Sequence, residues 1–392
     1  MSFCNYPQSD EHMYVLEVSY GCPDEKDPLN GVFQMDQSIA LKKYGHKVVF
    51  VAIDFRSIRK WRKWGINEYE IDGMPIVAFN FPFGPLFPNL RRKLAKLAFD
   101  RVFRLVTIHY GIPDLVHVHF GDMATCVDET CKRNGVPFVL TEHSSSINQE
   151  YIPERELKPL RKAYQDASAV IAVSSVLSKR INQFFNVHSI VIPNIIDFSV
   201  FTSKKQAHPS FQFVSAGNIK KEKGFDILVS AFQIMREKGF DVRLLIMGDG
   251  PEKTSLETMV RNARMSDYVS FYGKYTREDF AFELTKSDVF VLPSRGETFG
   301  VVYVEAMASG VPVIATACGG PEDFVEEGNG LLVSVDDISG LCDAMVYMRQ
   351  NISQYDRDSI IGKVKRRFND ETVALMISNV FNSVRDCYNE PS

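Results

Sequence analysis

Short apolar runs separated by amphipathic stretches recur along the whole chain. A run of about four to eight apolar residues bounded by turn residues is typical of a buried strand. The first stretch between two runs, 32–44, predicts a helix, and Gly45 stands where a C-cap glycine would end it. The runs that predict strands are 14–19, 47–52, 115–119, 137–140, 169–173, 211–217, 242–247, 269–271, 288–292 and 331–335. This alternation of strand and helix predicts an α/β fold with parallel sheets.

A polar stretch, 202–209, interrupts the alternation near the middle of the chain. A chain of 392 residues is long enough for two domains of ordinary size. Linkers between domains are commonly polar. We therefore expect an N-terminal domain over 1–200 and a C-terminal domain over 201–371, followed by an amphipathic last helix over about 372–392.

Composition and charge exclude several classes of protein. Apolar residues make up 45% and charged residues 24% of the chain, which are globular values, and the net charge of -4 gives no overall basic field for nucleic acid. The seven cysteines show neither C-x-x-C pairs nor zinc-ligand spacing, so reduced thiols in a cytoplasm are expected. We find no signal-peptide pattern and no apolar run of membrane-spanning length, so we expect neither export by a cleaved signal nor a helical anchor.

One segment is strongly basic. Residues 56–104 carry eleven Lys or Arg and four Asp or Glu, a local balance of +7. Trp61 and Trp64, the only tryptophans, lie in this segment, and the run FPFGPLFPNL leads into RRKLAKLAFDRVFRL. Basic residues with apolar and aromatic neighbours suit an anionic membrane surface. The alternative is a solvated helix face that balances acidic residues elsewhere. We favour the membrane surface, which predicts a peripheral protein on the inner leaflet of the plasma membrane.

A single carboxylate stands out in the second half of the chain. From Thr298 to Pro321 the only charged residue is Glu305, which lies after a predicted strand, a loop and a helix start near Gly300. A buried carboxylate is costly unless it is hydrogen-bonded. The vicinal hydroxyls of a ribose would satisfy it, as they do for acidic residues after a βα turn in nucleotide-binding folds. The alternative is a structural glutamate that caps nearby backbone.

Two further positions suit a ligand. The loop NIKKEKG, 218–224, precedes a predicted helix over 225–237, so free backbone N–H groups, the helix dipole and lysine side chains would favour an anion there. His143 follows a predicted strand, and open α/β sheets bind ligands at strand ends. His117 and His119 have no such support, and we expect both to be structural.

Several motifs together resemble the donor-site signature of the family 4 retaining glycosyltransferases. Glu297 and Glu305 form E-x7-E, which A-M-A-x-G-x-P-V-I-A follows. Lys223-Gly224 matches the K-G of the family. The run IVIPNIID resembles the family's I-P-N-G-V-D, with Ile195 in place of the glycine.

The chain also departs from the family pattern. Gly31 fits the second glycine of the Gly-Gly pair that the family carries beside the donor phosphates, whereas Asn30 replaces the first. Asn218 stands where the family commonly has an arginine, which removes a bidentate phosphate donor. Lys220 or Lys221 could substitute for it, although solvent exposure explains both lysines more simply.

The resemblance implies a GT-B fold, two Rossmann-like domains facing a central cleft. The first domain would bind the acceptor and the second a nucleotide sugar, and the last helix would cross back onto the first domain. The implied reaction is transfer of a hexosyl group from a UDP or GDP sugar to a glycan acceptor, with retention at the anomeric carbon. The nucleotide sugar is a substrate, and we expect no cofactor and no metal ion.

The resemblance also implies roles for individual residues. Lys223 and the start of the helix 225–237 would stabilise the leaving diphosphate. Glu297 would hold hydroxyls of the donor sugar, Glu305 would hold the ribose, and His143 would contact the sugar. The other donor-site positions that the resemblance marks are Gly31, Asn218, Lys274, Thr298, Phe299, Gly300 and Val301.

Two rival functions share this fold. A nucleotide-sugar 2-epimerase would convert its donor without any acceptor. A non-catalytic partner subunit would bind a glycan or another transferase, and the departures at Asn218 and Ile195 are its only support. We favour a transferase whose acceptor is lipid-linked and belongs to bacterial surface polysaccharide synthesis, because most enzymes of this type with a basic first domain act there.

Overall fold

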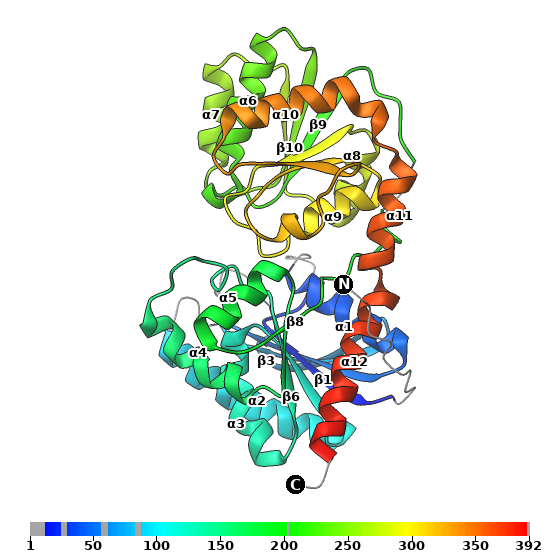
Figure 1. The fold of residues 1–392 in the computed structure, drawn as a ribbon. Helices are drawn as coiled ribbons and strands as arrows, with labels where there is room; N and C mark the ends of the chain where they lie inside the picture. The colour runs from blue at the N-terminus through cyan, green and yellow to red at the C-terminus, as the bar shows by residue number, and fades with distance from the viewer. Residues whose placement is uncertain (1–11, 25–29, 56–61, 83–87, 202–203, 390–392) are drawn as a thin grey trace. The chain divides into compact units, whose positions relative to one another are not determined.

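The computed structural model describes residues 12–24, 30–55, 62–82, 88–201 and 204–389. The chain forms two compact units (Figure 1). Unit 1 contains Met1–Ile195 and Asp370–Ser392, and unit 2 contains Ile196–Asn369. The chain therefore leaves unit 1 once and returns to it with its last helix, α12 (Asp370–Asn389).

Unit 1 is built on a mostly parallel sheet. Among its described residues the strands lie in the order β3-β4-β2-β1-β5-β6-β7-β8, and only β3 pairs antiparallel with its neighbour. The chain winds outward from β1 and then returns to its other side with β5, so the strand order reverses between β1 and β5. The strands are β1 (Tyr14–Ser19), β2 (Lys47–Asp54), β3 (Gly65–Ile71), β4 (Met74–Asn80), β5 (Leu115–His119), β6 (Phe138–Glu142), β7 (Ala169–Ala172) and β8 (Ile190–Val191).

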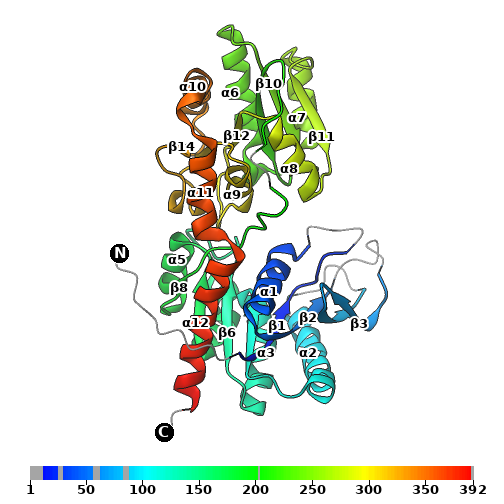
Figure 2. The same ribbon diagram turned by 90° about the vertical axis from the view of Figure 1, so that its right-hand side faces the viewer.

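Helices cover both faces of this sheet (Figure 2). Apolar residues of α1 and α12 share one core cluster with the sheet, while α2 and α3 pack against each other and contact β2, β4, β5 and β6. The predicted C-cap at Gly45 is confirmed, with its left-handed φ of 118°. The helices are α1 (Val32–Tyr44), α2 (Pro88–Tyr110), α3 (Gly121–Asn134), α4 (Glu154–Asp166), α5 (Ser175–Phe185) and α12.

A β-hairpin lies inside the basic segment, and the sequence analysis did not predict it. β3 and β4 pair across Asp72 and Gly73, whose φ angles are 49° and 67°. Positive φ at both central residues is the type I′ geometry that matches the twist of paired strands. Trp61 and residues 83–87 of the same segment lie outside the described residues.

Unit 2 contains an all-parallel sheet in the order β11-β10-β9-β12-β13-β14. Numbered along the chain this is 3-2-1-4-5-6, the order of a doubly wound dinucleotide-binding fold. The prediction of two Rossmann-like domains is therefore confirmed. The strands are β9 (Phe211–Ala216), β10 (Val242–Met247), β11 (Val269–Gly273), β12 (Val289–Leu292), β13 (Val313–Thr316) and β14 (Gly330–Val333).

The helices of unit 2 include the two that the sequence analysis placed beside the donor. α6 has the predicted bounds Phe225–Glu237, and α9 (Val301–Ala308) begins directly after Gly300. The remaining α-helices of the described part of unit 2 are α7 (Lys253–Asn262), α8 (Arg277–Thr285), α10 (Ile338–Asn351) and α11 (Arg357–Phe368), and short 3-10 turns are η1 (Lys221–Lys223), η2 (Gly320–Asp323) and η3 (Ile352–Gln354).

Within the described ranges, no helix is both long enough and apolar enough to cross a membrane. The cysteines of these ranges form no disulfide and stand as free thiols.

Candidate active site

Two loops meet at the strand ends of unit 2 where the strand order reverses. One follows β9 and the other follows β12, and these strands are parallel neighbours. Gly224 closes the first loop with a φ of 67°, and a Cβ there would lie 2.0 Å from the carbonyl oxygen of Pro293. The two backbones can approach so closely only because position 224 is a glycine. Ligands of open α/β sheets bind at this kind of reversal point.

A partly buried ion pair joins the two loops. Lys223 Nζ lies 2.6 Å from Glu297 Oε1, and Ser294 Oγ donates to the same oxygen at 2.7 Å. Glu297 is only 7% exposed. The residue predicted to contact the diphosphate and the residue predicted to contact the sugar therefore lie together, although 74 positions separate them in the sequence.

Arg295 fixes the position of the second loop, and the sequence analysis missed it. Its guanidinium contacts Asp226 at 2.8 Å and Asp336 at 2.7 Å, and its backbone N–H donates to the carbonyl of Glu222. These contacts tie the loop to η1, to the first turn of α6 and to the residues after β14. Arg295 therefore anchors the loop that carries Glu297.

Glu305 has a partner that the sequence analysis did not foresee. The carboxylate is 9% exposed on α9, and its Oε1 lies 3.1 Å from Nε of Arg277, the first residue of α8. Burial, and then the charge of Glu305, raise the pKa of the neighbouring Tyr275. The carboxylate is therefore satisfied by an arginine, which neither of the two interpretations made from the sequence had included.

The start of α9 lies beside this carboxylate in sequence and is buried. Thr298, Phe299 and Gly300 are all buried, and Gly300 has a φ of 91°. The first N–H groups of a helix have no partner within it, and they favour anions. The start of α9 can therefore add backbone donors to the Lys223 charge.

Other predicted donor residues lie on the surface. Asn218, Lys220, Lys221 and Lys274 are exposed. Lys274 follows β11, the edge strand, which β10 separates from β9. The structure therefore brings Lys223 to Glu297 but leaves the other lysines of these loops in solvent.

In unit 1, the loop after β1 leads into α1. Gly31 has a φ of 73° at the N-cap of α1, and a Cβ there would lie 3.0 Å from the carbonyl oxygen of Gly21. Asn30 Nδ2 donates to the carbonyl of Cys22 at 3.2 Å. Gly31 is thus required by the local backbone, and Asn30 ties the loop to itself.

Glu142 is a structural anchor at the end of β6. It is wholly buried, and its carboxylate accepts the backbone N–H groups of Gly121 at 2.8 Å, His143 at 2.9 Å and Ser144 at 2.8 Å. The Tyr164 hydroxyl also bonds to it. Glu142 is therefore not a solvated residue: it fixes the backbone from which the His143 side chain projects.

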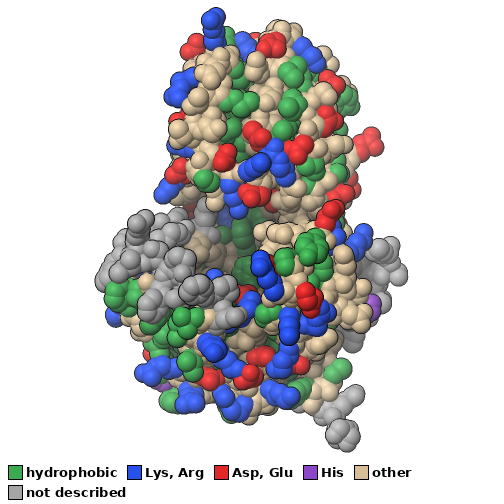
Figure 3. Space-filling view, turned by 90° about the vertical axis from the view of Figure 1, so that its left-hand side faces the viewer, with side chains coloured by type: hydrophobic (Ala, Val, Ile, Leu, Met, Phe, Trp, Pro, Cys, Tyr) green, Lys and Arg blue, Asp and Glu red, His purple; other side chains and the backbone are tan. Residues whose placement is uncertain are grey.

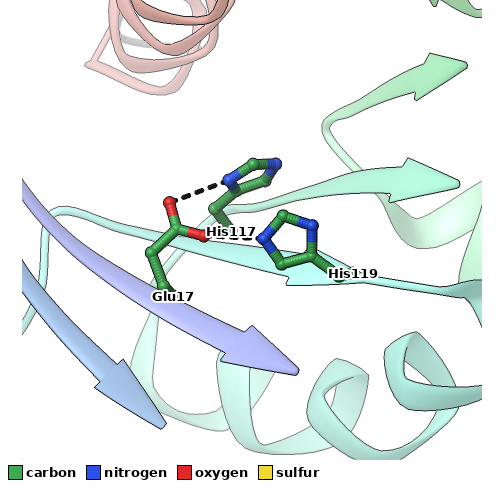
Figure 4. Close-up of side chains that lie close together, drawn as sticks. All are labelled: Glu17, His117 and His119. Carbon is green, nitrogen blue, oxygen red and sulfur yellow. Dashed lines mark hydrogen bonds and ion pairs between the residues drawn. The ribbon is translucent and has the colours of Figure 1, made fainter. Parts of the chain in front are cut away.

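His143 belongs to a column of buried polar side chains, which the sequence analysis did not predict. His143 Nε2 lies 3.1 Å from His119 Nδ1. His119 Nε2 lies 2.8 Å from one oxygen of Glu17, and His117 Nδ1 lies 2.9 Å from the other (Figure 4). The Thr141 hydroxyl lies 2.7 Å from His117 Nε2. His119, which we expected to be only structural, is therefore connected to a predicted site residue.

Glu17, His117 and His119 are also the one group in the described residues whose ligand atoms are close enough to hold a metal ion. Each of these atoms already takes part in a hydrogen bond within the column, and all three side chains are wholly buried. A buried polar group with a partner gains little from a further ligand. We therefore interpret the column as a hydrogen-bond network.

Two protein-family models match the chain. The model of "Glycosyltransferase Family 4" matches residues 32–200, and the model of "Glycosyl transferases group 1" matches residues 210–351. The first match lies in unit 1 and the second in unit 2, so each compact unit is recognised separately.

Two similar proteins come from bacilli. The chain is 24% identical over 375 residues to the N-acetyl-alpha-D-glucosaminyl L-malate synthase of Bacillus anthracis, a match that covers 91% of this chain and 94% of that protein. It is 27% identical over 386 residues to the putative teichuronic acid biosynthesis glycosyltransferase TuaC of Bacillus subtilis, with 89% of this chain and 90% of TuaC covered.

Solved structures resemble the chain over nearly its whole length. Sucrose-phosphate synthase from Thermosynechococcus elongatus superposes with a TM-score of 0.81 at 20% identity, covering 96% of this chain and 100% of that one. Anabaena HepE in complex with UDP and glucose gives a TM-score of 0.74 at 18% identity, covering 95% and 100%. At these identities the likeness establishes the shared fold.

Proposed function

Because the chain belongs to the family 4 glycosyltransferases and has their GT-B fold, we propose that it transfers a hexosyl group from a nucleoside diphosphate sugar with retention at the anomeric carbon. The observation that carries this proposal is the Lys223–Glu297 pair at the strand-order reversal of unit 2. A lysine ammonium has three donors, so it can hold Glu297 and a phosphate oxygen together.

The electrostatics of this site suit a departing diphosphate. Negative charge grows on the leaving group as the glycosidic bond breaks, and fixed donors that meet this charge lower the barrier. Lys223 and the N-terminus of α6, which begins two residues later, would supply those donors. Glu297 would orient the hydroxyls of the sugar, since each carboxylate oxygen can accept more than one hydrogen bond.

The nucleotide would bind along α9. We propose that Glu305 accepts the ribose hydroxyls while Arg277 holds the carboxylate in place at 3.1 Å. The complex of HepE with UDP and glucose supports a uridine donor for this chain.

The acceptor would bind unit 1. Aromatic and charged side chains there line a cavity of about 780 Å³, which includes Tyr20, Arg91, Phe120 and Arg155. Phe120 has a φ of 74°, a strained value for a residue with a bulky side chain, and such strain gathers at functional sites. Mixed aromatic and hydrogen-bonding surfaces suit a sugar, so we propose a glycan acceptor.

Some basic residues of helix α2 pair with acidic residues of the neighbouring helix. Arg92 and Lys96 form ion pairs with Asp122 and Glu129 of α3. Arg92 and Lys96 therefore fit the alternative interpretation, in which a basic helix face balances acidic residues of the same protein. Because their charges are balanced within the protein, these two residues would contribute little to membrane binding.

The outer face of α2 remains a candidate surface for binding a membrane. Figure 3 shows Lys and Arg side chains on unit 1, mixed with acidic and hydrophobic ones. The exposed side chains recur at helical spacing, as on an interfacial helix. They include Leu90, Lys93, Leu97, Arg101, Arg104 and Ile108. We propose that this face binds an anionic membrane and that the acceptor glycan is lipid-linked. The similarity to TuaC, a putative teichuronic acid biosynthesis glycosyltransferase, supports a polysaccharide acceptor.

The test is a panel of nucleotides and nucleotide sugars scored by the unfolding midpoint. A ligand that binds only the native state raises the midpoint. We expect a UDP or GDP compound to raise it for wild type and to raise it less for Glu305→Gln, because an amide is a weaker acceptor for the ribose diol. A folded Glu305→Gln protein that binds like wild type would refute the ribose assignment, and a panel without any binder would refute the donor proposal.

A further inference from the structure

The backbone of Glu297 is held by the loop that follows β13. Glu297 and Gly319 form an isolated parallel β-bridge. The N–H of Glu297 donates to the carbonyl of Cys318 at 3.4 Å, and the N–H of Gly320 donates to the carbonyl of Glu297 at 2.9 Å. A Cβ at Gly320 would lie 2.3 Å from the carbonyl oxygen of Phe299, so the two loops approach this closely because position 320 is a glycine. The backbone that carries the Glu297 side chain is therefore fixed.

Ser294 lies three residues before Glu297 and is wholly buried. Its carbonyl accepts a hydrogen bond from the hydroxyl of Thr316 in β13. The hydroxyl of Tyr303 in α9, which donates to the carbonyl of Leu292 at 2.6 Å, also lies within hydrogen-bonding reach of Ser294. Contacts from β13 and α9 therefore fix the position of Ser294.

The proton of the Ser294 hydroxyl belongs to the contact with Glu297. Ser294 Oγ lies 2.7 Å from Glu297 Oε1, and Lys223 Nζ lies 2.6 Å from the same oxygen. An ionised carboxylate can only accept hydrogen bonds. Hydrogen bonds to a charged acceptor are roughly twice as strong as those between neutral groups, so the carboxylate competes better for this proton than the Tyr303 hydroxyl.

The two donors to Glu297 Oε1 differ in their freedom to move. The ammonium of Lys223 ends a flexible four-carbon stem, and the side chain is 22% exposed. The hydroxyl of Ser294 is one bond from Cβ, on a residue that is wholly buried. Lys223 can therefore turn toward an anion, whereas Ser294 cannot follow it.

We propose that Ser294 is a positioning residue, which holds the Glu297 carboxylate in place when Lys223 turns toward the diphosphate of the donor. The identity of the anion that attracts Lys223 rests on the proposed function. The contact between Ser294 and Glu297 belongs to unit 2 alone. A carboxylate that is already oriented loses less side-chain freedom when it binds the hydroxyls of the hexosyl group, which favours both affinity and rate.

The direct test uses Lys223→Ala, which removes the lysine from the carboxylate without any ligand. Crystal structures of wild type, Lys223→Ala and Lys223→Ala/Ser294→Ala give the readout. We expect Glu297 to keep its side-chain torsion angles in Lys223→Ala, because Ser294 still donates to Oε1. In the double variant the carboxylate should rotate or take several conformations. A carboxylate that moves in Lys223→Ala, or that stays fixed in the double variant, would overturn the proposal.

Ligand binding and turnover by Ser294→Ala give a second test, which a merely structural role would not satisfy. UDP and GDP should shift the unfolding midpoint of this variant as they shift that of wild type, since neither carries a hexosyl group for Glu297 to hold. The kcat for release of nucleoside diphosphate from UDP-glucose or GDP-mannose should fall about tenfold or more, as expected for one lost hydrogen bond to a charged group. Parallel losses of nucleotide binding and kcat would contradict the positioning role.

Ser309→Ala is the matched control. Ser309 is also wholly buried in unit 2, and its hydroxyl forms no hydrogen bond within the described residues. We expect nucleotide binding like that of wild type and a kcat within about twofold of it, because no hydrogen bond is lost. Equal kcat values in Ser294→Ala and Ser309→Ala would refute the proposal. A wild-type protein that binds no nucleotide would defeat the proposed function, while the crystal structures would still decide the role of Ser294.

Discussion

At the scale of single residues, the candidate donor site of unit 2 depends on ion pairs between side chains that are distant in the sequence. Separate motifs indicated Lys223 and Glu297, and in the structure Lys223 Nζ lies 2.6 Å from Glu297 Oε1. Arg277 and Arg295 were missed because their role depends on carboxylates that are distant in the sequence. No local pattern indicates that Arg277 reaches Glu305, which is 28 positions away. The strand that carries His117 and His119 was predicted, but the carboxylate that orients them lies about one hundred positions earlier.

The Lys223–Glu297 pair should contribute to stability as well as to catalysis. Removing one partner leaves the other charge poorly compensated, and buried pairs are costly to break. Because Lys223 is 22% exposed, we expect Lys223→Ala to lower the free energy of unfolding by about 1–3 kcal/mol. Lys220→Ala, an exposed neighbour, should change it by less than about 0.5 kcal/mol.

A double-mutant cycle with Glu297→Gln measures the coupling by urea unfolding. We expect the double variant to be more stable than the sum of the single losses predicts, by about 1 kcal/mol or more. Additive losses would mean that the two side chains do not interact.

The buried imidazole of His119 should make stability depend on pH. Its pKa is lowered in the folded protein, so below pH 6.5 the unfolded chain binds a proton that the folded chain refuses. Stability is therefore fully present above about pH 6.5 and falls as the pH decreases, by up to about 1.4 kcal/mol per pH unit for this group.

Urea unfolding of wild type and His119→Phe at pH 7 and pH 5.5 checks this dependence. The variant should lose less stability between the two pH values. An unchanged or steeper loss would show that His119 is already protonated in the folded protein.

At the scale of elements, most strands and helices follow from apolar patterning, and the errors have physical causes. β6 ends at Glu142, two residues beyond its predicted end. Thr141 and Glu142 are polar, which suggested a loop, but both side chains are buried and form hydrogen bonds within the protein, so the strand continues through them. The hairpin of β3 and β4 was not predicted because the sequence analysis considered only the charge of this segment and not its turn residues. Asp72-Gly73 is a strong hairpin signal, and it was available in the sequence.

The junction of the two donor loops depends on one glycine. Gly224→Ala would force a side chain into a left-handed φ and within 2.0 Å of a backbone carbonyl. We expect this change to destabilise the protein by more than about 2 kcal/mol and to weaken nucleotide binding, because α6 must shift away from Pro293. Thermal unfolding with and without nucleotide measures both effects.

Gly296→Ala is the control within the same pair of loops. A Cβ at Gly296 would meet nothing within 4 Å, and its φ is not left-handed. We expect stability and nucleotide binding close to those of wild type. If the two variants behave alike, the close approach at Gly224 does not support the site.

At the scale of the whole molecule, alternation of strand and helix predicts two α/β domains but not the order of their strands. The order is seen only in the structure, where the 3-2-1-4-5-6 sheet of unit 2 fits the Rossmann-like domain that the family resemblance implied. The structure divides the chain at 195/196 and 369/370, where the sequence analysis expected 200/201 and 371/372. The polar stretch 202–209 lies after the first division, on the unit 2 side of it, and the residues at the division itself are mostly apolar. Composition therefore indicated a division in this region but not its position.

Membrane binding should depend on the exposed basic residues of α2. Each basic residue near an anionic surface adds about 1 kcal/mol, so changing Lys93, Arg101 and Arg104 together to Gln should weaken binding on the order of one hundred-fold. Co-sedimentation with vesicles of neutral lipid, with and without phosphatidylserine, measures this loss.

A triple variant of unit 2 with the same change in charge is the control. Arg243, Lys365 and Arg366 are exposed there, and changing them to Gln should leave sedimentation unaltered. If both variants lose binding equally, net charge rather than the α2 face is responsible. If wild type does not distinguish the two vesicle compositions, the acceptor is more simply a soluble glycan.

The central claim is that Lys223 stabilises a nucleoside diphosphate as it leaves a sugar. The most direct measurement is the rate of nucleoside diphosphate release from the bound donor, with and without a glycan acceptor, in wild type and Lys223→Ala. We predict that acceptor accelerates release by wild type, and that Lys223→Ala binds the donor within several-fold but releases diphosphate about one hundred-fold more slowly, which corresponds to about 2.7 kcal/mol of barrier. Equal release rates in the two proteins, or donor conversion that needs no acceptor, would contradict the account.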